Sequence, residues 1–199
     1  MGKSDFLINE TDQHYVIKKP SFRYLDEFVR LKCAPDLLAL KLFPNAKEIT
    51  ESMALFNAVK KELPDISELG RKMNVAVIGD GSTPRTAALF AFMSSWQVTS
   101  IDPRLKPLKG IIKRLCCILA KVEDVIDDVC PEILVFPHAH TKFDELPSWC
   151  GREAKIIVSM PCCEPWASGQ LLWRGIPPYK VYADWGVHSP HRTIRVWKS

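Results

Sequence analysis

Residues 74–92, NVAVIGDGSTPRTAALFAF, constrain the fold more than any other stretch of the chain. Val75–Ile78 form an apolar run typical of a buried strand, which ends at the turn Gly79-Asp80-Gly81. The apolar residues from Ala87 to Met93 then predict a helix that packs on this strand. A strand, a glycine-containing turn and a helix suit a nucleotide-like ligand. We expect the first-turn amides of the helix to be free, and the glycines to let a ligand approach the backbone.

Strand and helix patterns alternate through the rest of the chain. We expect further strands at residues 97–102, 115–122, 132–136, 155–160, 180–188 and 192–198. We expect helices at residues 84–95, 106–114 and 125–129, with a partly helical connector at 143–150. The alternation predicts an α/β fold: a Rossmann-like, mostly parallel sheet with helices on both faces and a C-terminal antiparallel hairpin. Ligands of such sheets bind at the carboxyl ends of the strands, where the sequences GDGSTP, IDPR, VED, PHAH and MPCC lie.

The N-terminal third of the chain has a different pattern. Residues 1–20 are polar and irregular, whereas residues 21–63 show the apolar spacing of three helices, with Pro35 opening the second helix and Pro44 ending it. We expect an N-terminal tail and helical extension at residues 1–69 that packs on the main domain. The ligand-binding domain is expected at residues 70–199.

Composition narrows the class of protein. Apolar residues make up 47% and charged residues 25% of the 199 positions, which is ordinary for a globular protein. No apolar run approaches the roughly 20 residues that span a bilayer, and MGKSDFLINETDQ at the start lacks the apolar core of a signal peptide. We therefore expect an intracellular, cytoplasmic protein without a membrane segment.

Charge alone indicates no partner, because the net charge is only +4. The basic residues near the two ends of the chain would nevertheless suit phosphate contacts, or else form ordinary solvated faces. They are Lys18, Lys19, Arg23, Arg30, Lys32, Arg192, Arg195 and Lys198.

The seven cysteines include two adjacent pairs, Cys116-Cys117 and Cys162-Cys163. Their odd number and apolar setting favour reduced thiols over a disulfide framework. No CxxC spacing is present, so we expect no metal, although Cys150, Cys162, Cys163 and His138 could converge in space.

The glycine turn departs from the dinucleotide pattern G-x-G-x-x-G at its sixth position, which is Pro84. A proline suits the first turn of a helix, with Ser82 or Thr83 as its cap, but it removes one amide from a pyrophosphate cradle. No Gly-Lys-Ser/Thr follows, so a P-loop is excluded. A nicotinamide cofactor is therefore disfavoured.

At these residues the chain resembles the class I S-adenosylmethionine-dependent methyltransferases, over roughly residues 70–199. Gly79-Asp80-Gly81 match the family's loose G-x-G turn, and Asp102 matches the acid that holds the ribose hydroxyls. Glu123 or Asp124 matches an acid near the adenine, and the hairpin at 179–198 matches the family's antiparallel last strand. The resemblance implies S-adenosyl-L-methionine as cofactor. The cofactor-binding residues it predicts are Gly79, Asp80, Gly81, Ser82, Thr83, Pro84, Asp102, Glu123, Asp124 and His138.

A narrower likeness concerns the strand ends that face the methyl group in this family. His138 after the fourth strand and Pro161-Cys162-Cys163 after the fifth are similar to a branch that includes several tRNA methyltransferases, although PHAHTKF lacks that branch's H-x-C-G sequence. The likeness implies an RNA acceptor, with His138, Cys162 and Trp166 around its pocket. Trp166 would stack on a base, or else close the edge of the sheet.

The sequence leaves two alternatives open, one for the role of Asp80 and one for the function of the whole chain. Asp80 could contact the amino group of the cofactor or cap the following helix. The whole chain could be a non-catalytic, methyltransferase-like module that serves as the partner of another subunit, with the N-terminal helices as the contact surface.

Overall fold

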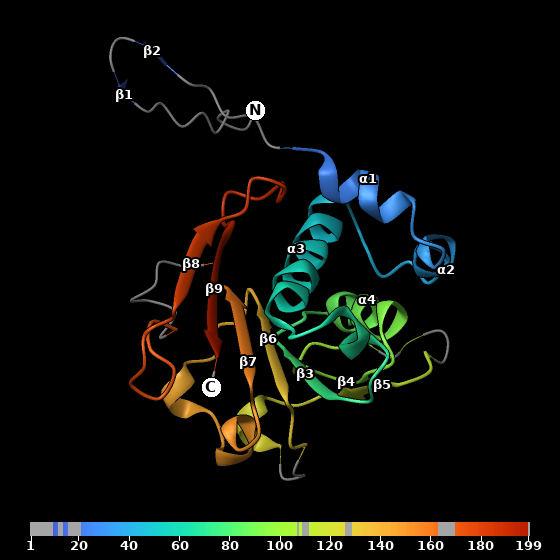
Figure 1. Ribbon diagram of the computed structural model, residues 1–199. Helices are drawn as coiled ribbons and strands as arrows, with labels where there is room; N and C mark the ends of the chain where they lie inside the picture. Colours follow the sequence, from blue (N-terminus) through green and yellow to red (C-terminus); the bar gives the residue numbers. More distant parts are fainter. Residues whose placement is uncertain are drawn as a thin grey trace.

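The computed structural model describes residues 21–106, 108, 112–125, 129–162 and 170–198, together with a short pair of strands, β1 (Glu10–Thr11) and β2 (His14–Tyr15). Its centre is a seven-stranded sheet in the order β5-β4-β3-β6-β7-β9-β8 (Figure 1). The strands are β3 (Asn74–Ile78), β4 (Gln97–Ile101), β5 (Leu115–Ile118), β6 (Ile133–Pro137), β7 (Ile156–Met160), β8 (Lys180–Ala183) and β9 (Thr193–Lys198).

Strands β3 to β7 are parallel, and β9 runs antiparallel to both of its neighbours, β7 and β8. The chain reaches β6 on the side of β3 opposite to β4, so the order of the strands reverses between β3 and β6. The carboxyl ends of β3, β4 and β6 meet at this switch point, which is where ligands of open α/β sheets bind.

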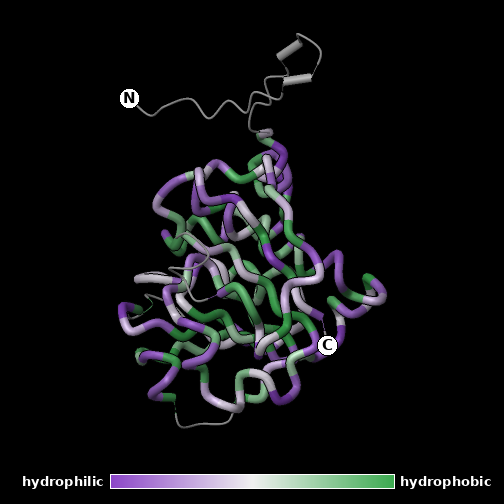
Figure 2. Tube along the Cα trace, turned by 90° about the vertical axis from the view of Figure 1, so that its left-hand side faces the viewer, coloured by the Kyte–Doolittle hydropathy of each residue, from purple (hydrophilic) through white to green (hydrophobic). Residues whose placement is uncertain are grey.

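Alternate side chains of each central strand enter two separate hydrophobic cores. Val75 and Val77 of β3 face one core, whereas Ala76 and Ile78 face the other. This period of two follows from strand geometry. Both faces are buried, which explains why β3, β6 and β7 are almost continuously apolar in sequence. Figure 2 shows the hydrophobic stretches inside and the hydrophilic ones at the periphery.

The α-helices of the described residues cover the first face (Figure 1). They are α1 (Arg23–Val29), α2 (Ala34–Ala39), α3 (Ala46–Glu62) and α4 (Arg85–Met93). Helix α3 packs on β6, β7 and α4, and all four helices share one core with the sheet. The boundary between extension and main domain stays a prediction. No described helix is long and apolar enough to cross a membrane.

The second face carries short 3-10 helices and loops. The 3-10 helices here are η2 (Val122–Asp124), η3 (Phe143–Glu145) and η4 (Ser148–Gly151), while a fourth, η1 (Ile66–Leu69), precedes β3. Aromatic rings fill this layer, with Phe143 in edge contact with both Trp173 and Trp197. Large rings let a thin layer bury the sheet without a long helix.

The predicted α/β fold class is confirmed, but the described residues of the second face form 3-10 helices and loops rather than the expected α-helices, and the connections differ. Strand β5, which the sequence predicts at residues 115–122, ends at Ile118. The described residues of the helices expected at 106–114 and 125–129 are not helical, and a 3-10 helix stands at 122–124 instead. These segments are too short for an apolar stripe of period 3.6 to be distinguished from a loop.

Candidate functional site

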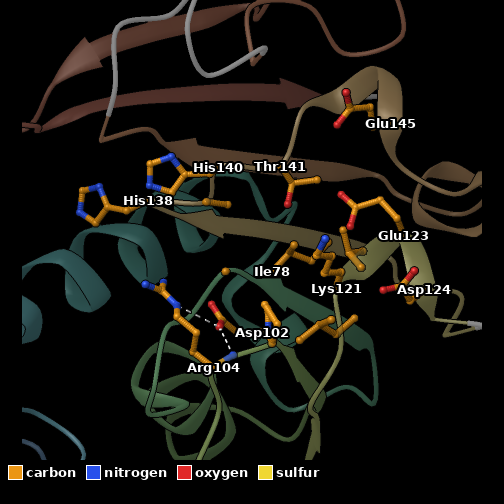
Figure 3. A pocket seen from close by; sticks show the side chains of 15 residues that line it. Ile78, Asp102, Arg104, Lys121, Glu123, Asp124, His138, His140, Thr141 and Glu145 are labelled. Carbon is orange, nitrogen blue, oxygen red and sulfur yellow. Dashed lines mark hydrogen bonds and ion pairs between the residues drawn. The ribbon is translucent and has the colours of Figure 1, made fainter.

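A cavity of about 540 Å³ lies at the carboxyl edge of the sheet, at the switch point between β3 and β6 (Figure 3). In Figure 3, His138 and His140 lie on one side and Glu123 and Asp124 on the other. The lining residues are Ile78, Gly79, Ile101, Asp102, Pro103, Arg104, Lys121, Val122, Glu123, Asp124, His138, Ala139, His140, Thr141 and Glu145. The volume is within the roughly 300–1,000 Å³ of small-molecule sites.

The glycine turn after β3 forms one wall of this cavity. Gly79 and Gly81 have φ angles of +82° and +83°, which side chains other than glycine rarely adopt. A Cβ on Gly79 would lie 2.7 Å from the Cβ of Ala139. Gly79 therefore allows the loop after β6 to pack directly against the turn after β3.

Asp80 lies beneath the turn and does not line the cavity. Its carboxylate is fully buried and accepts hydrogen bonds from the amides of Thr86 (3.0 Å) and Ala87 (2.9 Å), in the first turn of α4. Burial raises the pKa of Asp80 above its ordinary value. Of the two alternatives for Asp80, the structure shows the helix cap.

This cap corrects two expectations about α4. The amides of Thr86 and Ala87 are occupied by Asp80 rather than free for a ligand. The cap is Asp80 rather than Ser82 or Thr83, because the Thr83 hydroxyl donates to the carbonyl of Leu42 instead. Ser82, Thr83 and Pro84, all predicted to bind the cofactor, lie outside the cavity lining, and their role stays a prediction.

Asp102 lies at the end of β4 and lines the cavity with only 3% of its surface exposed. The amide of Gly81 donates to Oδ2 at 2.8 Å, and the amide of Arg104 donates to Oδ1 at 2.7 Å. Each carboxylate oxygen can accept two hydrogen bonds, so each keeps an acceptor position beside its backbone amide, and a hydroxyl at Oδ1 would compete with Nε of Arg104, 3.5 Å away. The carboxylate is thus fixed in direction and still able to hold two hydroxyl groups.

Glu123 and Asp124 lie in η2, across the cavity from the histidines, and both side chains are exposed. Val122 beside them is buried and also lines the cavity. An apolar surface next to exposed acceptors suits a flat ring with an amino group.

His138 begins the loop after β6 with φ +54°, an uncommon conformation outside glycine. Its amide donates to the carbonyl of Met160 at 3.0 Å, so the loop stays joined to β7. Its Nε2 lies 2.8 Å from Oε1 of Glu51, an almost fully buried residue of α3. Burial by itself raises the pKa of Glu51, but the contacts with His138 and Lys47 outweigh it and lower the pKa.

Two further residues were missed by the sequence analysis. Glu51 lies in the third helix of the predicted extension. The structure shows that this helix is buried on most of its sides, and a charged residue in such a helix indicates a specific partner. Gln170 is fully buried and accepts from the hydroxyl of Ser159 (2.5 Å). Its amide donates to the carbonyls of Ala139 (2.9 Å) and Thr141 (3.0 Å) and so fixes the loop that lines the cavity.

Cys162 lies behind the same loop, outside the cavity lining. Its Sγ is 3.5 Å from Nε2 of His140 and 3.6 Å from the carbonyl oxygen of His138. Cys163 and Trp166 lie outside the described residues, so the predicted acceptor pocket of His138, Cys162 and Trp166 stays a prediction.

The six described cysteines form no disulfide with one another. Burial raises the pKa of Cys150 to about 12 and that of Cys117 to about 11, so these two thiols stay protonated at neutral pH. Among the described residues, no cluster of three or more His, Cys, Asp or Glu is arranged to hold a metal ion.

Two of the three basic residues near the C-terminus do not lie on the surface that the sequence suggested. Arg192 and Arg195 are each only 7% exposed, and the Arg192 guanidinium lies over the ring of Trp185. Arg23 forms an ion pair with Asp184. The exposed cations at the cavity are instead Arg104 and Lys121.

No protein-family model matches the sequence, and no curated protein matches it. Solved structures similar to this chain include a probable spermidine synthase from Corynebacterium glutamicum (14% identity, 56% of this chain and 47% of that chain, TM-score 0.37). A variant of MtNAS in complex with S-adenosylmethionine is another (12% identity, 88% of this chain and 70% of that chain, TM-score 0.48). A third is the 16S rRNA (adenine(1408)-N(1))-methyltransferase from Catenulisporales acidiphilia (15% identity, 68% of this chain and 94% of that chain, TM-score 0.40).

The chain spans about half the length of the probable spermidine synthase. Similarity this low carries no information on activity, substrate or cofactor. The observed sheet, with β9 antiparallel between β7 and β8, is the mostly parallel sheet with a C-terminal antiparallel hairpin that the sequence predicts. The predicted fold is therefore confirmed, whereas the branch with Pro-Cys-Cys stays a prediction.

Proposed function

We propose that the chain binds S-adenosyl-L-methionine in the switch-point cavity and transfers its methyl group. The observation that carries this proposal is the position of Asp80. A buried carboxylate occupies the first-turn amides of α4, where a dinucleotide would need its pyrophosphate. A nucleoside ligand without phosphate groups fits this edge better than NAD does.

The residues of the cavity fit such a ligand in three places. Asp102 keeps an acceptor position on each oxygen for the two ribose hydroxyls, while Gly81 and Arg104 fix its orientation. Glu123 or Asp124, next to Val122, would hold the adenine. Gly79 lines the cavity with its backbone, beside which the remaining part of the molecule would lie.

The bound cofactor would supply an electrophilic methyl group on a sulfonium. The chain's own contribution is then alignment of the acceptor, which needs few catalytic side chains. The apolar side chains of Ile78, Ile101 and Ala139 line the same cavity as His138, beside which the acceptor would lie.

Calorimetry with S-adenosylmethionine, S-adenosylhomocysteine and NAD tests the cofactor. We expect the first two to bind and NAD not to bind. Binding of NAD alone would overturn the proposal. A chain that binds S-adenosylmethionine yet transfers no methyl group would favour the non-catalytic partner module.

For the acceptor we propose RNA. Arg104, with 73% of its side chain exposed, and Lys121 stand beside the cavity, where they would contact phosphates of a bound strand. Transfer of a tritiated methyl group to total cellular RNA tests this acceptor directly. RNA binding, followed by filter retention, should weaken steeply between low and moderate salt.

A pair of charge variants locates the RNA surface. Arg104→Ala should lower RNA affinity and flatten its salt dependence, because one phosphate contact is lost. Lys155→Ala serves as the matched control, since Lys155 is similarly exposed but precedes β7, at the amino end of the strands. Equal effects of the two substitutions would contradict an RNA surface at the cavity.

A further inference from the structure

The contact between Glu51 and His138 joins the N-terminal helices to the cavity. His138 lines the cavity with 15% of its side chain exposed, and Glu51, at 3%, approaches from α3. Nε2 and Oε1 are 2.8 Å apart, although the angle of the contact is not that of a linear hydrogen bond. The carboxylate therefore acts on the imidazole mainly through its charge.

Stability gives no reason for this pair. Burying a carboxylate beside an imidazole seldom stabilises a fold more than well-packed apolar side chains do, because both polar groups lose their hydration. His138 also holds a left-handed backbone at φ +54°. Conformations of this kind cost about 1–3 kcal/mol and gather at functional sites.

The second ring nitrogen is the more informative atom. Nδ1 of His138 is buried and has no hydrogen-bond partner among the described residues. Leaving such an atom without a partner costs about 1–3 kcal/mol, so an unpaired, buried nitrogen on a cavity-lining residue calls for a functional explanation. A bound acceptor that presents an N–H or O–H group would satisfy it.

Helix α3 holds Glu51 rigidly. Ser52 bonds Thr86 of α4 (3.0 Å), and the hydroxyl of Thr50 accepts from the amide of His188 in the loop between β8 and β9 (3.0 Å). The other groups that face the Glu51 carboxylate are Lys47, 3.3 Å away on α3, and Ser189 of the same loop. A carboxylate on such a platform can orient an imidazole within the tolerance that catalysis needs.

We propose that His138, supported by Glu51, is the base that removes a proton from the methyl acceptor, so that the acceptor belongs to the class that carries an ionisable N–H or O–H group. This inference rests on the proposed methyl transfer. The N–H or O–H bond of the acceptor breaks, and Nδ1 of His138 takes the proton. The electron pair left on the acceptor atom forms the new bond to the methyl carbon, while the methyl–sulfur bond breaks and its electrons stay on sulfur. Glu51, the positioning residue, stabilises the imidazolium.

Two variants separate this role from a structural one. Glu51→Gln keeps the shape of the side chain and removes its charge. His138→Gly suits the left-handed backbone and leaves a space in which free imidazole can bind. Glu62→Gln is the matched control, because Glu62 is also a buried, ion-paired carboxylate of α3, but its partner is Lys180, outside the cavity.

The assay is single-turnover transfer of a tritiated methyl group to total RNA, with calorimetry of S-adenosylmethionine on the same samples. His138→Gly should lose at least 100-fold in rate, as expected for a general base, and free imidazole should restore part of it. Glu51→Gln should lose at least tenfold in rate while its cofactor affinity stays within twofold of wild type. Glu62→Gln should keep the wild-type rate.

Urea unfolding gives a readout that does not depend on activity. The loss of stability in the double variant should be smaller than the sum of the two single losses, because Glu51 and His138 contact each other. Additive losses, a wild-type rate in His138→Gly, or no effect of imidazole on that variant would overturn the proposed base. A wild-type chain that binds no S-adenosylmethionine would instead overturn the proposed function, and this inference with it.

Discussion

The amide of Gly81 donates a hydrogen bond to Oδ2 of Asp102 at 2.8 Å, so the turn after β3 and the acid after β4 form one unit. The same turn places Asp80 under α4, where its carboxylate holds two helix amides. Asp80 thus supports the structure, while Asp102 faces the cavity. Gly79 and Gly81 both have positive φ angles, which let the chain bend sharply on either side of Asp80.

Asp102→Ala should weaken the binding of S-adenosylmethionine at least tenfold. A hydrogen bond to a charged group contributes about 1.5–3 kcal/mol, and about 1.4 kcal/mol corresponds to a tenfold change in affinity. Calorimetry measures this change. The control Asp65→Ala removes the cap of η1 outside the cavity lining and should leave the affinity as it is. Unchanged affinity in Asp102→Ala would refute the ribose contact.

Gly79→Ala should destabilise the fold more than Gly175→Ala does. Both glycines have φ near +80°, so an added Cβ strains the backbone at each, by about 1–2 kcal/mol. At Gly175 the new atom meets nothing within 4 Å, whereas at Gly79 it meets Ala139 at 2.7 Å. The difference between the two unfolding free energies, measured in urea, isolates the clash with the loop after β6. Equal losses would mean that the loop moves away freely.

Gln170→Met should lower both stability and cofactor affinity. The substitution keeps the volume but leaves the Ser159 hydroxyl and the carbonyls of Ala139 and Thr141 without their partner. Each buried polar group left unsatisfied costs about 1–3 kcal/mol. Gln97→Met, at an exposed position of β4, is the control and should change neither quantity. Urea unfolding and calorimetry give the two values, and a stable variant with normal affinity would show that Gln170 does not fix the loop.

The succession of strands along the chain and the positions of Gly79 and Asp102 at strand ends were predictable, because a period of two and a turn signal are local properties. The role of Asp80 was not predictable, since a carboxylate one residue after a strand can turn toward the ligand or toward the next helix. Glu51 and Gln170 contact the loop after β6 from distant parts of the chain. Such contacts leave no local pattern, apart from a polar residue where an apolar one is expected.

The exposure of the basic residues could not be predicted from the sequence either. Arg192 and Arg195 count as cations in the sequence, yet they are buried in the structure. Their burial depends on the antiparallel pairing of β8 and β9 and on Trp185, not on any neighbouring residue in the sequence. Clusters of basic residues near a chain end therefore do not by themselves predict a phosphate-binding surface.

Glu62→Gln should remove a pH-dependent part of the stability. Glu62 ends α3 and accepts hydrogen bonds from Lys180 (2.7 Å) and from the hydroxyl of Tyr179, which joins the helix to β8. Burial alone raises the pKa of Glu62, but these two partners outweigh it, so the pKa lies below its ordinary value of 4.5. An acid with a lowered pKa in the folded state stabilises the fold above its unfolded pKa, and this contribution disappears as the pH falls through the folded pKa.

The difference in urea midpoint between wild type and Glu62→Gln should therefore be largest at neutral pH. It should shrink as the pH falls from about 4.5 through the lower folded pKa, because the unfolded chain then binds a proton at Glu62 before the folded chain does. Lys180→Met, which removes the largest of the favourable contacts and leaves the acid in place, should reduce the same pH dependence. A difference that stays constant from pH 7 to the acid limit would show that the loss in Glu62→Gln comes from packing rather than from the ion pair.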